Sequence, residues 1–190
     1  MEGASLSVRD LACRRGDRLL FRGLSFALGQ GDALQIVGAN GTGKSSLLRI
    51  LAGLLRPFEG AVESVGPVAL LDGNLPLDEQ LPLSRSLAFW ERIDGVNETL
   101  DPALNTLLDV PVRFLSTGQR KRAAIAQSRP REEGIWLLDE PLNGLDVRAA
   151  EQLQCQVAGY RARGGIVVIA SHQPFALPGG KRIDLAEFAA

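Results

Sequence analysis

The sequence is poor in histidine, cysteine and net charge, and each shortage excludes a class of function. Its 190 residues include one histidine and two cysteines, Cys13 and Cys155, which lie far apart in the chain. A zinc cluster needs about four such ligands and is therefore excluded, while two isolated cysteines fit a reducing compartment. The 21 basic and 22 acidic residues leave a net charge of -1, which provides no general attraction to nucleic acid. We therefore expect no nucleic-acid partner.

Long apolar runs are also missing. A membrane span needs about 18 consecutive apolar residues, and no stretch approaches that length although 45% of the residues are hydrophobic. The N-terminal segment contains no apolar core of a signal peptide. We expect a single domain over residues 1–190 that associates with a membrane through partners only.

The apolar patterning predicts an α/β fold. Residues 5–11 and 19–28 loosely alternate between apolar and polar, as half-buried antiparallel strands do. Further strands are predicted at 33–37, 65–71, 135–138 and 166–170, and helices at 45–52, 119–128 and about 147–163. Strands that alternate with helices favour a mostly parallel core sheet, here with an N-terminal antiparallel β part. A small helical subdomain is expected within about 75–130.

A glycine-rich loop separates the strand at 33–37 from the next helix. Residues 38–45 match the pattern G-x-x-x-x-G-K-[ST], with a strand before them and a helix after them. Such a loop points successive N–H groups at phosphate oxygens, and the helix directs its positive dipole end toward them. Lys44 is expected to reach the β- and γ-phosphates, and Ser45 to bind Mg²⁺. The candidate phosphate-binding residues are Gly38, Ala39, Asn40, Gly41, Thr42, Gly43, Lys44, Ser45 and Ser46.

Two adjacent carboxylates end the strand at 135–138. Asp139 is placed to hold Mg²⁺, directly or through water, because it follows a buried strand next to a phosphate loop. Glu140 is then placed to orient or deprotonate the attacking water. An acidic turn at a strand end is common by itself, so the assignment depends on its pairing with the phosphate loop.

The segment Leu115-Ser-Thr-Gly-Gln resembles the LSGGQ signature of the ATP-binding cassette (ABC) family. Considered alone, Ser116 is simply an N-cap before a helix. The resemblance implies an ABC-type P-loop NTPase that binds ATP and works as a homodimer. It also implies that Ser116, Thr117, Gly118 and Gln119 contact the ATP of the partner chain. Thr117 replaces the usual glycine and adds a side chain near that phosphate.

Two more motifs follow in the family's order. Residues 142–146 resemble the D-loop, which places Asp146 near the nucleotides at the dimer interface. Ser171 and His172 follow the last buried strand, where the family has its switch histidine. The resemblance implies that His172 contacts the γ-phosphate, although a lone histidine is more often structural. Only a short tail is expected after it.

Two family features are altered in this sequence. Arg15 falls where the family has an aromatic side chain stacked on adenine, and it either stacks in its place or is a solvated surface arginine. The family's glutamine loop, which binds Mg²⁺, aligns with Asn74, whose side chain is about 1.5 Å shorter. Gln80 is the alternative, with poorer spacing.

Local matches at 18–26, 138–146 and 171–174 are similar to the ATP-binding subunits of bacterial cytochrome c maturation. That family is described as a haem-exporter ATPase, so the resemblance implies integral membrane subunits as partners and a place on the cytoplasmic side of the bacterial inner membrane. It also implies that an apolar string receives a helix of the membrane partner, although the same residues could instead fill a subdomain core. The string comprises Leu75, Leu77, Leu81, Leu83, Leu87, Phe89 and Trp90.

Three other functions remain open at this point. An ATPase of another small-cargo ABC exporter would carry the same motifs. A soluble ABC ATPase acting on ribosomes or DNA usually fuses two cassettes or carries a long coiled coil, and neither is found here. A P-loop kinase would transfer phosphate to a small acceptor, but the signature motif and Glu140 disfavour it.

Overall fold

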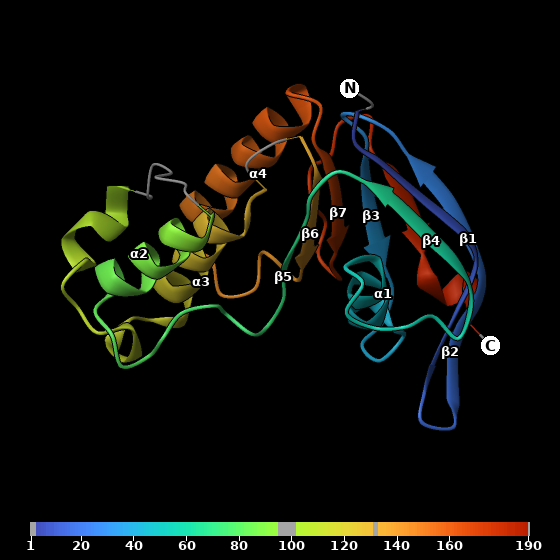
Figure 1. Cartoon of the computed structure of the whole chain (residues 1–190), viewed down its shortest axis with the longest axis horizontal. Helices are drawn as coiled ribbons and strands as arrows, with labels where there is room; N and C mark the ends of the chain where they lie inside the picture. Colours follow the sequence, from blue (N-terminus) through green and yellow to red (C-terminus); the bar gives the residue numbers. More distant parts are fainter. Residues whose placement is uncertain (1–2, 95–101, 131–132, 190) are drawn as a thin grey trace.

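Two β-sheets enclose a first helix, and a group of helices lies beyond the larger sheet (Figure 1). The computed structural model describes residues 3–94, 102–130 and 133–189. Within them, no helix has both the length and the hydropathy of a membrane span.

The smaller sheet is antiparallel and is formed near the N-terminus. Its strands are β1 (Ser5–Arg15), β2 (Arg18–Leu28) and β4 (Glu59–Val65), in the order β2-β1-β4. Leu6, Val8 and Leu24 are buried on its inner face, as the sequence alternation predicts.

The larger sheet is parallel throughout. Its strands are β5 (Val68–Leu71), β6 (Ile135–Asp139), β7 (Ile166–Ala170), β3 (Ala33–Val37) and β8 (Lys181–Asp184), in the order β5-β6-β7-β3-β8. Every residue of β7 is buried, since both faces of the sheet are covered. The predicted combination of a mostly parallel sheet with an antiparallel part is confirmed.

Each face of the parallel sheet packs into a different core. Between the sheets, α1 (Lys44–Leu51) buries Leu47 and Leu48 in the larger core. On the opposite face, α4 (Val147–Ala162) packs Leu153 and Val157 against Trp136 of β6. A third core joins α2 (Leu83–Asp94), η1 (Pro102–Leu107), η2 (Val112–Phe114) and α3 (Thr117–Ser128).

The predicted strand at 65–71 is confirmed over Val68–Leu71, but its start is wrong because the chain changes sheets within the predicted range. β4 ends at Val65 in the antiparallel sheet, and β5 begins at Val68 in the parallel one. Gly66 makes the bend with a φ of 97°, which favours glycine. Pro67 follows, and its carbonyl accepts a hydrogen bond from the N–H of Ile135. The Gly66-Pro67 pair is a typical turn signal that the predicted strand ran through.

The residues after His172 do more than form a tail. They supply the edge strand β8 and then η3 (Leu185–Phe188), whose Leu185 is 0% exposed within the larger core. Ala189 forms a β-bridge with Phe21 of β2. The C-terminal segment therefore holds both sheets together.

We expect Leu185→Ala to lower the free energy of unfolding by about 2–5 kcal/mol, because it leaves a cavity in the shared core. Urea unfolding followed by circular dichroism measures this change. The neighbouring Glu187 is exposed, so Glu187→Ala should stay within about 0.5 kcal/mol of the wild type. Equal stability of the two variants would contradict the structural role of Leu185.

Candidate functional site

Three parallel strands end side by side and place the predicted motifs at one edge of the sheet. Ile36 of β3 pairs with Ala170 of β7, and Ala170 pairs in turn with Asp139 of β6. The next peptides continue this register, because Glu140 N donates to Ala170 O at 2.8 Å and Ser171 N donates to Ile36 O at 3.1 Å. The phosphate loop, the acidic pair and His172 therefore converge.

The phosphate loop has the backbone that its glycines predict. Gly38, Gly41 and Gly43 have φ values of 145°, 84° and 107°, which favour glycine. Gly43 also packs closely on Phe21, where an added Cβ would lie 3.1 Å from the ring. Gly43 caps α1 without a side chain that could occupy the first-turn amides. Those amides and the helix dipole suit an anion.

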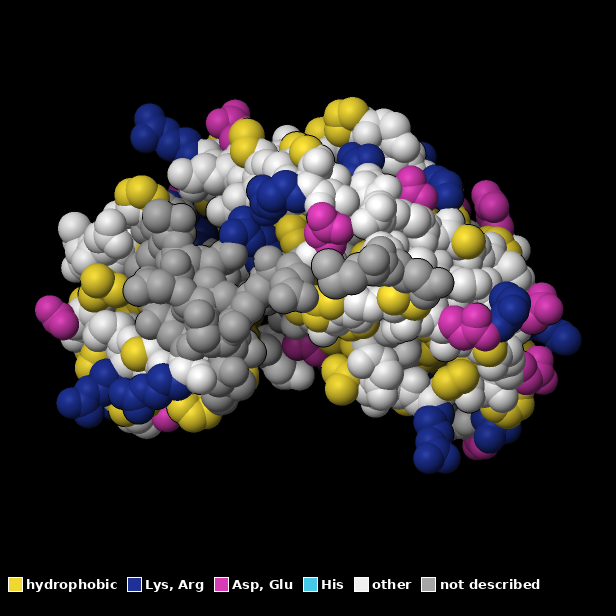
Figure 2. All heavy atoms as spheres, turned by 45° about the horizontal axis from the view of Figure 1, so that its top comes forward, with side chains coloured by type: hydrophobic (Ala, Val, Ile, Leu, Met, Phe, Trp, Pro, Cys, Tyr) yellow, Lys and Arg dark blue, Asp and Glu magenta, His cyan; other side chains and the backbone are white. Residues whose placement is uncertain are grey.

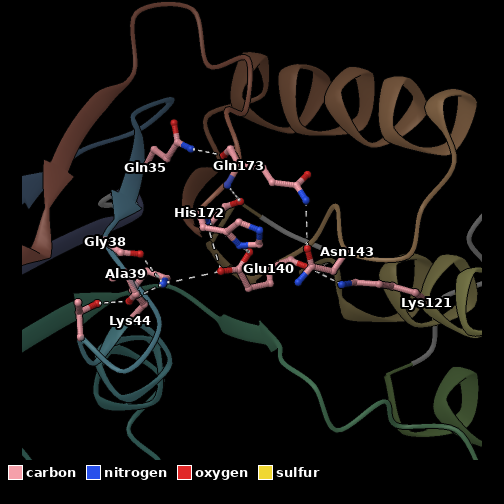
Figure 3. Close-up of polar contacts among 11 residues, drawn as sticks. Gln35, Gly38, Ala39, Lys44, Lys121, Glu140, Asn143, His172 and Gln173 are labelled. Carbon is pink, nitrogen blue, oxygen red and sulfur yellow. Dashed lines mark hydrogen bonds and ion pairs between the residues drawn. The ribbon is translucent and has the colours of Figure 1, made fainter.

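Lys44 lies inside this loop and is 6% exposed. Its Nζ donates to Gly38 O at 2.8 Å and to Ala39 O at 3.2 Å, and it lies 3.8 Å from Glu140 Oε1 (Figure 3). A buried ammonium group between a phosphate loop and a carboxylate can neutralise phosphate charge there.

Asp139 and Ser45 present oxygen atoms that suit Mg²⁺. Asp139 Oδ1 is buried with no hydrogen-bond partner, while the Ser45 hydroxyl hydrogen-bonds to the same carboxyl group. Burial raises the pKa of Asp139, and the nearby carboxylates Glu140 and Asp72 raise it further. A buried, unpaired carboxylate oxygen beside a hydroxyl is a favourable ligand set for a hard cation that also binds phosphate oxygens.

Glu140 and His172 form a second pair at this edge (Figure 3). His172 Nδ1 lies 2.8 Å from Glu140 Oε2, and the backbone N–H of His172 faces both carboxylate oxygens at 3.3 and 3.4 Å. The carboxylate is thereby held between the imidazole and Lys44. It can accept a proton from a water molecule that faces the phosphate loop.

The signature segment begins α3 with a capping box. The Ser116 hydroxyl accepts from Gln119 N at 3.2 Å, and Gln119 Oε1 accepts from Ser116 N at 2.8 Å. Ser116 and Thr117 are exposed. The structure thus places this helix start at the surface, and the predicted contact with a partner's ATP stays a prediction.

Three other predicted residues have identifiable neighbours. Ser46 hydrogen-bonds to the thiol of Cys13, whose pKa burial raises. Arg15 ends β1 and is exposed, and its charge acts on that same thiol. Asp146 is the N-cap of α4, with Oδ1 accepting from Ala149 N at 2.8 Å. A nucleotide role for each of them stays a prediction.

The two glutamine-loop candidates have different surroundings. Asn74 is exposed, and its N–H donates to Asp72 Oδ1 at 2.8 Å just beyond β5. Asp72 is fixed by an ion pair with Arg49 at 3.1 Å. Gln80 instead accepts a hydrogen bond from Arg113. Asn74 therefore lies nearer the end of β5, and its predicted Mg²⁺ contact is untested.

Three further residues lie beside this site and were not predicted from the sequence: Lys121, Asn143 and Gln173 (Figure 3). Lys121 Nζ donates to the Glu140 carbonyl, and Gln173 Nε2 contacts Asn143 Oδ1 at 3.5 Å. Lys121 occurs in a run of basic residues that indicates an exposed helix face, so its position in the sequence gave no sign of this contact.

The fold and site define a class of protein. Residues 21–143 match the ABC transporter family, and the chain belongs to that family. An ABC transporter ATP-binding protein from Pyrococcus furiosus has the same fold, with a TM-score of 0.80 over 98% of this chain and 100% of the other at 20% identity.

Relatives with much higher identity narrow the comparison. The chain is 54% identical to the cytochrome c biogenesis ATP-binding export protein CcmA of Novosphingobium aromaticivorans, over 99% of each sequence. It is 48% identical to the protein of the same name from Zymomonas mobilis subsp. mobilis, over 98% of this chain and 87% of the relative. The resemblance recognised from the local motifs is confirmed along nearly the whole chain.

Asp139→Asn should raise the melting temperature of the ligand-free protein at neutral pH while abolishing Mg²⁺-dependent ATP hydrolysis. A carboxyl whose pKa is raised by folding binds its proton more tightly when folded, so its charged form destabilises the fold above that pKa. We expect an increase of about 2–4 °C, corresponding to ~1 kcal/mol in a domain of this size.

The difference in melting temperature should narrow as the pH is lowered through the raised pKa, because the wild-type carboxyl is then neutral as well. Differential scanning fluorimetry of both proteins at a series of pH values measures this difference in melting temperature. The exposed Asp17 provides the control substitution Asp17→Asn, which should leave both stability and hydrolysis unchanged. A lower melting temperature for Asp139→Asn at neutral pH would show that the charge is stabilising.

Proposed function

We propose that this chain is the ATP-hydrolysing subunit of a cytochrome c biogenesis exporter. The observation that carries the proposal is the convergence of Lys44, Asp139, Glu140 and His172 beside a phosphate loop. The products are ADP and inorganic phosphate. A homodimer of such subunits would drive integral membrane subunits.

The arrangement assigns a separate task to each side chain. The loop amides and Lys44 bind the β- and γ-phosphates, and Ser45 and Asp139 hold Mg²⁺, which neutralises phosphate charge when bound. Glu140 accepts a proton from the water that attacks the γ-phosphorus. The bond from that phosphorus to the bridging oxygen breaks, and ADP leaves. His172 orients the Glu140 carboxylate through the 2.8 Å contact.

Dimerisation is supported by the exposed start of α3. Ser116 and Thr117 are exposed at a capped helix N-terminus, which suits an anion from another chain. Asp146 lies at the N-terminus of α4, immediately before Val147, which is 75% exposed. In the proposed dimer these two surfaces face the partner chain and its ATP.

The relatives favour cytochrome c biogenesis over another export system. Their name describes an ATP-binding export protein of that process, and one of them matches 99% of this chain. Haem is the cargo that the family resemblance implies. The proposed location is the cytoplasmic side of the bacterial inner membrane, reached through the membrane subunits.

Charge disfavours a ribosome or DNA partner. Over the coloured part of the face in Figure 2, Lys and Arg side chains are interspersed with Asp and Glu, in keeping with the net charge of -1. A nucleic-acid surface would need a contiguous basic patch.

A groove of 360 Å³ supports docking of a membrane subunit near the glutamine-loop segment. Its lining includes Leu75, Leu77, Leu81, Phe89 and Trp90. The other two members of the apolar string, Leu83 and Leu87, are buried in the third core. The core interpretation therefore applies to Leu83 and Leu87, and docking is proposed for the residues that line the groove. Leu83→Asp would unfold the subdomain and cannot test docking, whereas residues lining the groove can.

Glu140→Gln should bind ATP but hydrolyse it about 10²-fold more slowly, because an amide cannot accept the proton from water. Phosphate release and equilibrium ATP binding measure the two properties. The exposed Glu187 gives the matched control Glu187→Gln, which should keep the wild-type rate. A rate near wild type for Glu140→Gln would transfer the base role to another group. ADP release by the wild type that required an added acceptor, without release of free phosphate, would indicate a kinase.

Mass spectrometry of the proteins that co-purify with Glu140→Gln from native membranes tests the biological assignment. Polytopic membrane subunits and haem-handling factors are the expected partners. Recovery of ribosomes or DNA would refute the exporter assignment and leave the ATPase chemistry intact.

Phe89→Asp should reduce co-purification of the membrane subunits by at least about tenfold, since it places a charge in an apolar groove. Phe89 is 55% exposed, so ATP binding and stability should change little. Leu54→Asp is the matched control, because Leu54 is 71% exposed and outside the groove. Undiminished co-purification of the Phe89 variant would exclude this groove as the docking site.

A further inference from the structure

The peptide of Glu140 has an unusual conformation that its surroundings must maintain. Its φ is 45°, in the left-handed region that non-glycine residues rarely adopt. Such a conformation is strained and persists only where neighbouring groups hold it. The direction of the Glu140 side chain depends on this peptide.

Three hydrogen bonds hold the Glu140 backbone, and they come from different parts of the chain. Its N–H donates to Ala170 O in the neighbouring strand. Its carbonyl accepts from Asn143 N at 3.2 Å within the same turn, and also from Lys121 Nζ. Lys121 belongs to α3, so this third bond crosses from the helix that carries the signature segment (Figure 3).

Burial of the charged Lys121 side chain is unfavourable unless a specific interaction compensates for the lost hydration. Burial lowers the pKa of Lys121, and the carboxylates of Glu140 and Asp139 oppose that change. An amine directed at a backbone carbonyl next to two acids forms a charge-assisted hydrogen bond, which is stronger than a neutral one.

A second contact fixes α3 on the same turn. An added Cβ at Gly118 would lie 2.6 Å from Gly144 O, so the start of α3 packs against the backbone four residues beyond Glu140. Gly118 and Lys121 are close in sequence on α3. Together they connect the signature helix to the turn from 140 to 144 at two points.

We propose that Lys121 is a positioning residue that holds the Glu140 peptide in its left-handed conformation. The Glu140 carboxylate then faces the phosphate loop only while α3 is packed on the 140–144 turn. This inference rests on the proposed ATPase function and adds a residue to it. In this role Lys121 acts through the Glu140 carbonyl.

The experiment compares full-length variants in steady-state ATP hydrolysis. Lys121→Met should lower kcat by about tenfold, the rate equivalent of one modest hydrogen bond, with little change in KM for ATP. Lys121→Arg keeps a cationic donor and should recover most of kcat. Lys181→Met is the matched control, because Lys181 Nζ also donates to a backbone carbonyl, Ala27 O at 2.8 Å, at the opposite end of the sheet. It should retain the wild-type kcat.

A double-variant cycle separates positioning from general structural damage. If Lys121 acts through Glu140, adding Lys121→Met to Glu140→Gln should slow single-turnover hydrolysis by less than about twofold further. A general structural role would lower the rate by the same factor in both backgrounds. Melting temperatures of all variants identify any that do not fold.

The outcomes distinguish this inference from the proposed function. Four results would each overturn the role of Lys121 and leave Glu140 as the base. The first two are a wild-type kcat for Lys121→Met and an effect of that substitution on KM alone. The others are an equal loss of rate in both backgrounds, and an unfolded Lys121→Met beside a folded but inactive Lys121→Arg. A near-normal rate for Glu140→Gln would instead overturn the base assignment, and the Lys121 inference with it.

Discussion

The register of β6, β7 and β3 is the constraint on which the rest of the site depends. Asp139, Ala170 and Ile36 lie in one row across three strands. Backbone hydrogen bonds therefore position the residues that follow this row independently of their side-chain contacts. This register allows little slippage, because a shift of one residue would move the side chains of β7 from one core into the other. Catalytic geometry is thus a consequence of core packing.

The buried polar groups of the site are stabilised by one another rather than by solvent. Lys44 lies between loop carbonyls and Glu140, and Glu140 lies between Lys44 and His172. Asp139 is the exception, with one buried oxygen that has no partner. This arrangement is less stable than a fully paired one would be, and it keeps a ligand position open for a cation. Stability and activity therefore impose opposite demands on the same carboxylate.

Much of this architecture could be predicted from the sequence because the signals were local. A glycine-rich loop between a strand and a helix, and an apolar strand ending in acids, specify their own backbone. The change of sheet at Gly66 carried only a local turn signal, Gly66-Pro67, and that signal does not specify which sheet each flanking strand joins, because the partners of those strands lie elsewhere in the chain. Leu185 and Lys121 were missed for a similar reason. Leu185 gains its importance from a distant core and Lys121 from a distant carbonyl, and neither contact leaves a periodic pattern in its own segment.

The passage from β4 to β5 has a mechanical consequence. Only two residues separate β4 from β5, and an added Cβ at Gly134 would lie 2.3 Å from the Pro67 carbonyl. The hydrogen bond from Ile135 to Pro67 ties this connection to β6. The connection therefore has little slack with which to absorb a movement of the antiparallel sheet relative to the parallel one.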